Sequence, residues 1–164
     1  MNNSISLIGM AGAGKSSIGK KLAEHLNFDF IDSDLLIEKR YGQSLQDILN
    51  QNGNEKFKEI EEGALLSVEF NQIVLATGGS AVFCDTAMEY IKENSTVIYL
   101  EVTYEDISAR ISNFSERGLI KRPDQTIQEA YKEREGLYQH FADHIVQNNG
   151  KIESCLNKIL TLIN

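Results

Sequence analysis

Residues 9–16 restrict the fold of this 164-residue chain more than any other part of its sequence. They read Gly-Met-Ala-Gly-Ala-Gly-Lys-Ser and match the pattern G-x-x-x-x-G-K-[ST] at every fixed position. The apolar run 4–8 precedes the pattern, and a segment with apolar residues at helical spacing, 15–26, follows it. A strand, a glycine-rich loop and a helix in this order predict an α/β domain built on a parallel sheet.

The loop also predicts the binding of a nucleoside triphosphate. Glycines allow successive backbone N–H groups to point at phosphate oxygens, and the helix that begins near Lys15 adds the positive end of its dipole. We expect Lys15 to reach the β- and γ-phosphates of ATP and the Ser16 hydroxyl to bind Mg²⁺. The predicted nucleotide-binding residues of this loop are Gly9, Met10, Ala11, Gly12, Ala13, Gly14, Lys15, Ser16 and Ser17.

The rest of the chain alternates short apolar runs with segments of helical period, as α/β domains do. Further strands are expected at residues 28–31, 73–76, 96–100 and 144–146, and most read as the apolar runs of buried parallel strands. Helices are expected at residues 34–41, 45–50, 56–70, 86–93, 104–111, 127–140 and 152–163. We therefore predict a single domain over residues 1–164, with three α/β/α layers around a five-stranded parallel sheet.

Composition excludes several classes of function. The chain has 24 acidic and 16 basic side chains, and its net charge of −8 argues against a nucleic-acid partner. No apolar run approaches the roughly 20 residues that a membrane-spanning helix needs, and the first residues lack the basic start of a signal peptide. Cys84 and Cys155 are too few for a disulfide framework and are expected to be reduced thiols. We expect a cytoplasmic protein without a membrane partner.

Two carboxylates, Asp32 and Asp34, end the second expected strand. Ligands of parallel sheets bind beyond the carboxyl ends of the strands, and residues i and i+2 of an extended segment point the same way. We expect Asp32 to serve Mg²⁺ and its waters and Asp34 to accept a proton from an attacking hydroxyl. Alternatively, one aspartate caps the helix that begins near Asp34. The third strand, 73–76, has no carboxylate at its end, which favours the second strand for the metal role.

Two further segments can each be interpreted in two ways. The glycine pair Gly78 and Gly79 either brings backbone close to a ligand or forms a tight turn. The polar segment 113–125 is long for a connection and carries Arg117 and Arg122 among its cations. It is predicted to be a mobile lid, and a solvated surface loop is the alternative.

Taken in order along the chain, these motifs resemble those of the shikimate kinase family, from about residue 5 to residue 146. The resemblance rests on the glycine-rich loop and on Asp32-Ser33-Asp34, Phe57-Lys58-Glu59-Ile60-Glu61, Thr77-Gly78-Gly79, Arg122-Pro123, and Arg134 four residues before Tyr138. It implies a small P-loop kinase of nucleoside monophosphate kinase-like fold. It further implies a monomeric enzyme that phosphorylates a shikimate hydroxyl with ATP, giving shikimate 3-phosphate on the way to chorismate and the aromatic amino acids.

The resemblance also implies roles for residues at matching positions. Asp34 would hold the substrate hydroxyls and act as the catalytic base, while Gly78 and Gly79 would touch the substrate through their backbone. Lys58 and Arg134 would bind the substrate carboxylate.

On the nucleotide side, Lys15 and Ser16 match the nucleotide and Mg²⁺ positions of the family, and Asp32 matches the acid near the metal. Arg110 would lie against the adenine, and Arg122 would be the catalytic lid arginine over the phosphates. Arg117 competes for that role, but the family pairs its lid arginine with a proline, as Arg122 is paired here.

The sequence departs from the family at two positions. Lys58 stands where the family has arginine, and lysine offers a point donor where arginine offers a planar fork. Ser80 stands where the family has a third glycine. These departures leave two alternatives open: a related kinase of the gluconate type or for another hydroxy acid, and a nucleotide-binding module without transfer activity.

Overall fold

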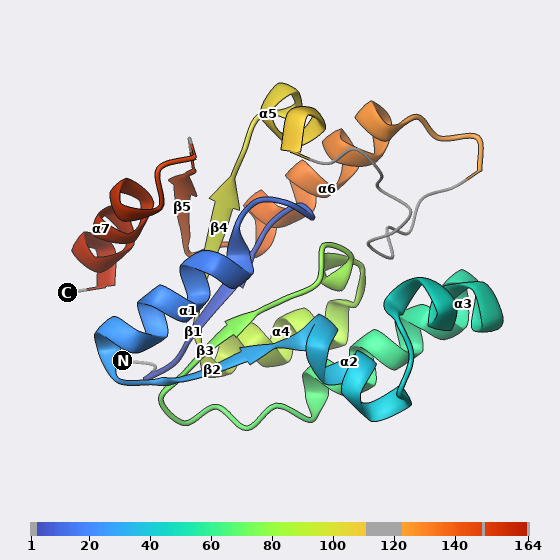
Figure 1. Cartoon of the computed structure of the whole chain (residues 1–164), viewed down its shortest axis with the longest axis horizontal. Helices are drawn as coiled ribbons and strands as arrows, with labels where there is room; N and C mark the ends of the chain where they lie inside the picture. The colour runs from blue at the N-terminus through green and yellow to red at the C-terminus, as the bar shows by residue number, and fades with distance from the viewer. Residues whose placement is uncertain (1–2, 111–122, 149, 164) are drawn as a thin grey trace.

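The computed structural model describes residues 3–110, 123–148 and 150–163, and its five strands form one sheet (Figure 1). The strand order is β2-β3-β1-β4-β5, and every neighbouring pair is parallel. This confirms the predicted five-stranded parallel sheet. The strands are β1 (Ile5–Ile8), β2 (Asp29–Asp32), β3 (Ile73–Ala76), β4 (Thr96–Glu101) and β5 (His144–Gln147).

Helices cover both faces of this sheet, which confirms the predicted three-layer arrangement (Figure 1). Helices α1 and α7 pack together on one face, and α4 and α6 cover the other, with α3 packed against α4. The helices are α1 (Lys15–Leu26), α2 (Ser33–Tyr41), α3 (Leu45–Leu66), α4 (Asp85–Asn94), α5 (Tyr104–Arg110), α6 (Ile127–Phe141) and α7 (Ile152–Ile163), and the 3₁₀ turn η1 is Ala81–Phe83.

The two helices expected at 45–50 and 56–70 are confirmed as two helical stretches of α3, separated at Gly53 by a non-helical φ of 76° and ψ of 173°. The second stretch ends at Leu66 and not at residue 70. The predicted burial of the strands is confirmed only in the middle of the sheet. The edge strands β2 and β5 are partly exposed, with Ile145 49% exposed, because each has a neighbour on one side only.

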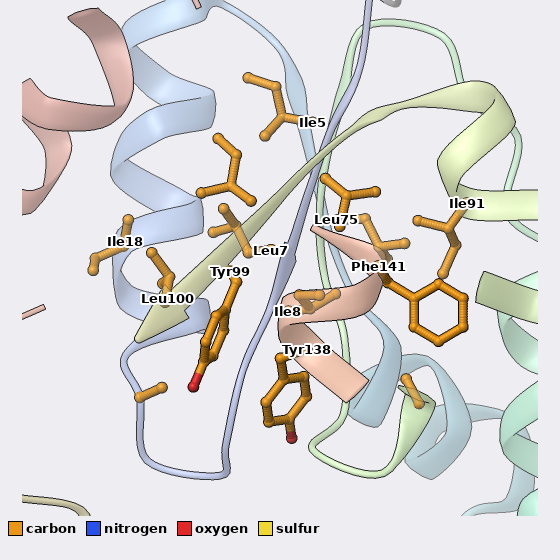
Figure 2. Close-up of a cluster of buried hydrophobic side chains, with 14 of the residues drawn as sticks. Ile5, Leu7, Ile8, Ile18, Leu75, Ile91, Tyr99, Leu100, Tyr138 and Phe141 are labelled. Carbon is orange, nitrogen blue, oxygen red and sulfur yellow. The ribbon is translucent and has the colours of Figure 1, made fainter. Parts of the chain in front are cut away.

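The core lies between the sheet and the helices on its two faces (Figure 2). Leu7, Ile8 and Leu100 from the central strands are fully buried, and the ring of Tyr99 stacks on Tyr138 of α6 at 5.0 Å. The core therefore fixes the carboxyl ends of β1 and β4 and the inner face of α6, from which site residues project.

Cys84 and Cys155 are both buried, and neither forms a disulfide. Burial raises the pKa of Cys84 to about 12, so its unreactive thiol form dominates. In the described ranges 3–110, 123–148 and 150–163, no helix is both long enough and apolar enough to cross a bilayer.

Candidate active site

The loop between β1 and α1 adopts the conformation that its glycines predict. Gly12 and Gly14 have φ angles of 82° and 95°, a region that side chains other than glycine rarely enter. A methyl group on Gly9 would lie 2.8 Å from the backbone oxygen of Leu100, so the start of the loop has no room for a side chain. The loop is thus fixed against β4 before α1 begins.

A cavity of 430 Å³ opens beside this loop. It brings together the loop, the start of α2, the segment after β3 and the end of α5. Its described lining residues are Ala11, Gly12, Gly14, Lys15, Ser16, Ser17, Asp34, Glu38, Leu45, Thr77, Gly79 and Arg110. Seven of the predicted nucleotide-binding residues are among them, while Glu38, Leu45 and Thr77 were not predicted.

Lys15 is the buried cation of the loop, with 7% of its surface exposed. Its Nζ donates hydrogen bonds to the backbone oxygens of Gly9 at 2.6 Å and Met10 at 2.8 Å. The side chains of Met10 and Ala13 point into the hydrophobic core, so these two predicted nucleotide-binding residues can offer a ligand only their backbone.

Asp32 caps α2, which is one of the roles that the sequence left open for this pair of acids, while its metal role stays a prediction. Its Oδ1 accepts hydrogen bonds from the backbone N–H groups of Asp34 at 3.0 Å and Leu35 at 3.3 Å, which caps α2. Its Oδ2 accepts a hydrogen bond of 2.5 Å from the Ser16 hydroxyl. Capping therefore uses one oxygen and directs the other to the first turn of α1.

The donor set of Ser16 and Asp32 fits Mg²⁺. Both groups are hard oxygen donors that meet beside the loop. In the described part of the chain, no cluster of three or more His, Cys, Asp or Glu side chains is placed to hold a metal ion. Mg²⁺ commonly takes only one or two protein ligands beside phosphate and water oxygens. One hydroxyl and one carboxylate therefore suffice.

Gly78 lies between two carboxyl groups, one on α2 and one on α3. A methyl group placed on Gly78 would lie 2.6 Å from Oδ1 of Asp34 and 2.6 Å from Oε2 of Glu61. The Gly78 N–H donates to the hydroxyl of buried Ser33 at 2.9 Å, which ties the segment to the start of α2. The Ala81 N–H donates to the Gly78 oxygen at 3.3 Å, so the glycine pair forms a turn, one of its two alternatives, while its contact with a ligand stays a prediction.

Glu61 is 1% exposed, and its pKa is raised from an ordinary value of 4.5 to about 8. Burial is the main cause and the carboxylate of Asp34 the second, while the cations Arg134 and Lys15 act in the opposite direction. Its Oε1 accepts no hydrogen bond from the residues that the model describes. Among the cations that favour the charged form of Glu61, Arg134 has the larger effect on its pKa and Lys15 the smaller.

The second glycine of the pair is held by α6. The Tyr138 hydroxyl on α6 donates to the backbone oxygen of Gly79 at 2.5 Å. A methyl group on Gly79 would lie 3.1 Å from the backbone nitrogen of Ala11. The segment after β3 therefore contacts the phosphate loop directly.

Two cations flank the site on the side away from α1. Arg134 on α6 is fully buried and donates from Nη1 to the Ala130 oxygen at 3.2 Å and from Nη2 to the Ser80 hydroxyl at 3.4 Å. Burial lowers the pKa of Arg134, although guanidinium groups stay protonated in proteins. Lys58 on α3 is half-buried, and its Nζ lies 5.4 Å from the centre of the Phe83 ring.

Arg110 lies at the opposite end of the cavity, where α5 ends. It donates from Nη1 to the Gly12 oxygen at 3.4 Å and from Nη2 to the Asn148 oxygen at 3.0 Å. The buried Asn148 side chain in turn donates to the Ala13 oxygen at 2.7 Å. Sequence reasoning missed Asn148, although it directly follows β5 at the ligand-binding end of the sheet.

Arg122, its competitor Arg117 and the predicted lid up to residue 122 lie outside the described residues. Their roles stay predictions.

With this geometry established, comparison with known proteins decides the family. A family model described as shikimate kinase matches residues 11–164 of the chain. The chain belongs to the shikimate kinase family. This confirms the resemblance found in the sequence motifs and the P-loop kinase fold class, and with them the prediction of a kinase that uses ATP.

Individual shikimate kinases match the chain over almost its full length. The shikimate kinase of Francisella tularensis subsp. novicida is 38% identical over 164 residues, which cover 97% of this chain and 93% of the relative. A structure of shikimate kinase from Acinetobacter baumannii in complex with shikimate is 32% identical, with a TM-score of 0.87 and coverage of 98% and 92%. The shikimate kinase of Aquifex aeolicus is 30% identical, with a TM-score of 0.86 and coverage of 98% and 95%.

Proposed function

We propose that this chain transfers the γ-phosphoryl group of ATP to a hydroxyl of shikimate, giving shikimate 3-phosphate and ADP. Family membership supports the reaction, and the observation that carries it is the phosphate loop and the Asp34 carboxylate at one cavity, with Arg134 bound to Ser80 directly after the lining residue Gly79. The two alternatives left open by the sequence are outcomes of the test below.

The nucleotide occupies the β1–α1 end of the cavity in this proposal. Backbone N–H groups of residues 9–17 and the Lys15 ammonium bind the phosphates, and Arg110 lies against the base. Lys15 exchanges its two backbone acceptors for phosphate oxygens, which carry more charge. Ser16 and Asp32 would hold Mg²⁺, which when bound neutralises phosphate charge.

The acceptor occupies the end between α2, α3 and α6. Asp34 lines the cavity from the first turn of α2 and receives the hydroxyl proton, while Gly78 and Gly79 offer backbone groups to the acceptor. Lys58 and Arg134 bind the acceptor carboxylate. Gly78 keeps its neighbours close because any side chain there would meet Asp34 and Glu61.

Transfer then needs positioning and charge stabilisation and no covalent enzyme intermediate. The acceptor oxygen attacks the γ-phosphorus in line, the bond to the β–γ bridging oxygen breaks, and ADP leaves with that electron pair. The hydroxyl proton passes to the Asp34 carboxylate. Lys15 stabilises the charge that develops on the transferred group.

An acceptor panel tests the proposal. ADP formation is measured with ATP and Mg²⁺, alone and with shikimate, gluconate or another hydroxy acid added, and phosphorus NMR identifies the product. We expect shikimate alone to accelerate ADP formation and to yield a phosphate ester. A response to gluconate or another acid instead indicates a related kinase, and silence toward every acceptor indicates a nucleotide-binding module.

We further propose that the protein acts as a monomer in the cytoplasm, with small molecules as its partners and neither nucleic acid nor membrane among them. The net charge of −8 supports the absence of nucleic-acid binding. The two buried thiols are consistent with a reducing compartment. Light scattering at micromolar concentration tests the oligomeric state, and a dimer mass would contradict it.

A further inference from the structure

Phe83, a residue that the sequence motifs do not include, lies beside both cations of the acceptor end. The centre of its ring is 4.9 Å from Cζ of Arg134 and 5.4 Å from Nζ of Lys58. Both distances fall within the roughly 6 Å over which the negative face of an aromatic ring attracts a cation. One ring therefore contacts a cation from α3 and a cation from α6.

The backbone around Phe83 is fixed to the same two helices. Cys84 Sγ donates to the Lys58 backbone oxygen at 3.7 Å, which ties this segment to α3. On the other side, the Ser80 hydroxyl accepts from Arg134 Nη2 at 3.4 Å, which ties it to α6. The 3₁₀ turn η1 that ends at Phe83 packs against both helices. The position of the ring is thus set by the fold as well as by the two cations.

The surroundings strengthen an aromatic contact. Phe83 and Lys58 are half-buried and Arg134 is fully buried, so water screens these cations poorly. Two like charges placed together repel each other, and the negative face of a ring near both offsets part of that repulsion. Lysine also loses much rotamer freedom when it is held in one place, and a ring beside the ammonium confines it before a ligand arrives.

We propose that Phe83 is a positioning residue that holds the Lys58 ammonium and the Arg134 guanidinium as a preformed site for the acceptor carboxylate. It acts through the two cations and contacts no reacting atom. The inference rests on the proposed function, since it deepens the description of the same acceptor site. It also joins the two departures from the family, Lys58 and Ser80, into one local arrangement with Phe83 at its centre.

Substitution of the ring by an aliphatic side chain tests the proposal. Phe83→Leu keeps an apolar side chain but removes the aromatic face, and Phe83→Tyr keeps the face. We expect Phe83→Leu to raise the KM for shikimate about three- to tenfold, the range of a partly desolvated cation–π contact. The KM for ATP and kcat should stay within about twofold of wild type, because carboxylate binding is shared by ground and transition states. Phe83→Tyr should restore the KM.

The methyl ester of shikimate separates this role from a packing role. The ester lacks the negative charge that the cations would bind, so its KM should be the same for wild type and Phe83→Leu. Phe70→Leu is a matched control, since Phe70 packs edge-to-face on Tyr90 with ring centres 5.6 Å apart. It should lower the melting temperature and leave both KM values unchanged. A double variant with Lys58→Met should show a smaller effect of Phe83→Leu.

An unchanged KM for shikimate in Phe83→Leu overturns the proposal, as does an equal rise for shikimate and its ester. If the wild-type protein does not phosphorylate shikimate, it is the proposed function that fails. Calorimetric titration of the variants with shikimate and its ester then decides the role of Phe83. A loss of affinity confined to the charged ligand supports the role, and no such loss overturns it.

Discussion

The two ends of the cavity are built from different parts of the chain. The nucleotide end is largely one stretch, residues 9–17, and presents backbone groups beside a single buried lysine. The proposed acceptor end is lined by residues of α2, the start of α3 and the segment after β3, and the side chains of Lys58 and Arg134 lie beside it, outside the lining. The nucleotide end is therefore encoded by one local stretch of sequence, while the acceptor end forms only once distant elements have packed together.

The two ends of the cavity also differ in how their charged side chains are stabilised. Lys15 donates to two backbone oxygens of its own loop, so its ammonium is stabilised there before any ligand binds. At the acceptor end, Glu61 and Arg134 are buried where water cannot stabilise them, and each shifts the pKa of the other group toward its charged form. Changes at the acceptor end should therefore alter stability and pH dependence as well as substrate binding.

The largest expected effect is at the nucleotide end. Lys15→Met should abolish transfer, because it removes the cation that neutralises the transferred phosphoryl group. Far-UV circular dichroism should be unchanged, while the melting temperature falls because the Gly9 and Met10 oxygens lose their donor. Retention of more than about a tenth of the rate, equal to about 1.4 kcal/mol of barrier, would contradict the role of Lys15.

The second effect separates the two acids at the end of β2. Asp34→Asn should lower kcat by about 100-fold or more, since it removes the proposed base but keeps its size. Asp32→Asn should raise the Mg²⁺ concentration needed for half-maximal rate, because Asp32 would hold the ion with Ser16. Rates measured across a Mg²⁺ titration distinguish the two variants. Equal losses with unchanged metal dependence would show that the roles are wrongly assigned.

This contrast explains what the sequence could predict. The phosphate loop and the five-stranded parallel sheet follow from contiguous patterns, and the described structure contains them. The interruption at Gly53 also agrees with the sequence, which predicts separate helices on its two sides.

The acceptor end was predictable only in part. The resemblance to the family pointed to Lys58 and Arg134, but no periodicity indicates that Phe83 lies beside both. The same holds for Asn148, which reaches Ala13 across 135 positions of the chain. Such contacts depend on how helices pack across the sheet, which local residue patterns do not encode.

The third expected effect concerns the protonation of Glu61, which is buried at the acceptor end. The folded protein retains the Glu61 proton up to a pKa of about 8, while the unfolded chain loses it near 4.5. Between these pH values the unfolded state binds fewer protons, so this group makes the free energy of unfolding fall as pH rises. Glu61→Gln should flatten that slope, as measured by denaturant unfolding at several pH values. Glu59→Gln, on the exposed face of α3, is the matched control and should keep the slope. Identical slopes in wild type and Glu61→Gln would contradict the shift.

The smallest expected effect is that of a substitution at Lys58, at the acceptor end. Lys58→Arg should lower the KM for shikimate by about two- to tenfold, the value of one added hydrogen bond, because a guanidinium can grip a carboxylate with two donors. Neither kcat nor the KM for ATP should move, and initial rates with both substrates varied measure all three. Weaker use of shikimate would indicate a pocket shaped around lysine and favour a different acceptor.

Initial-rate kinetics of Arg134→Lys, with ATP and shikimate both varied, test most directly whether the two ends are separate. Lysine keeps the charge of this fully buried residue but loses its planar fork, and a melting curve confirms that the variant folds. We expect Arg134→Lys to raise the KM for shikimate by about tenfold or more, because a charge-assisted pair is weakened. The KM for ATP should stay within about twofold of wild type. Parallel rises in both KM values, or no change in either, would contradict this separation of the two ends.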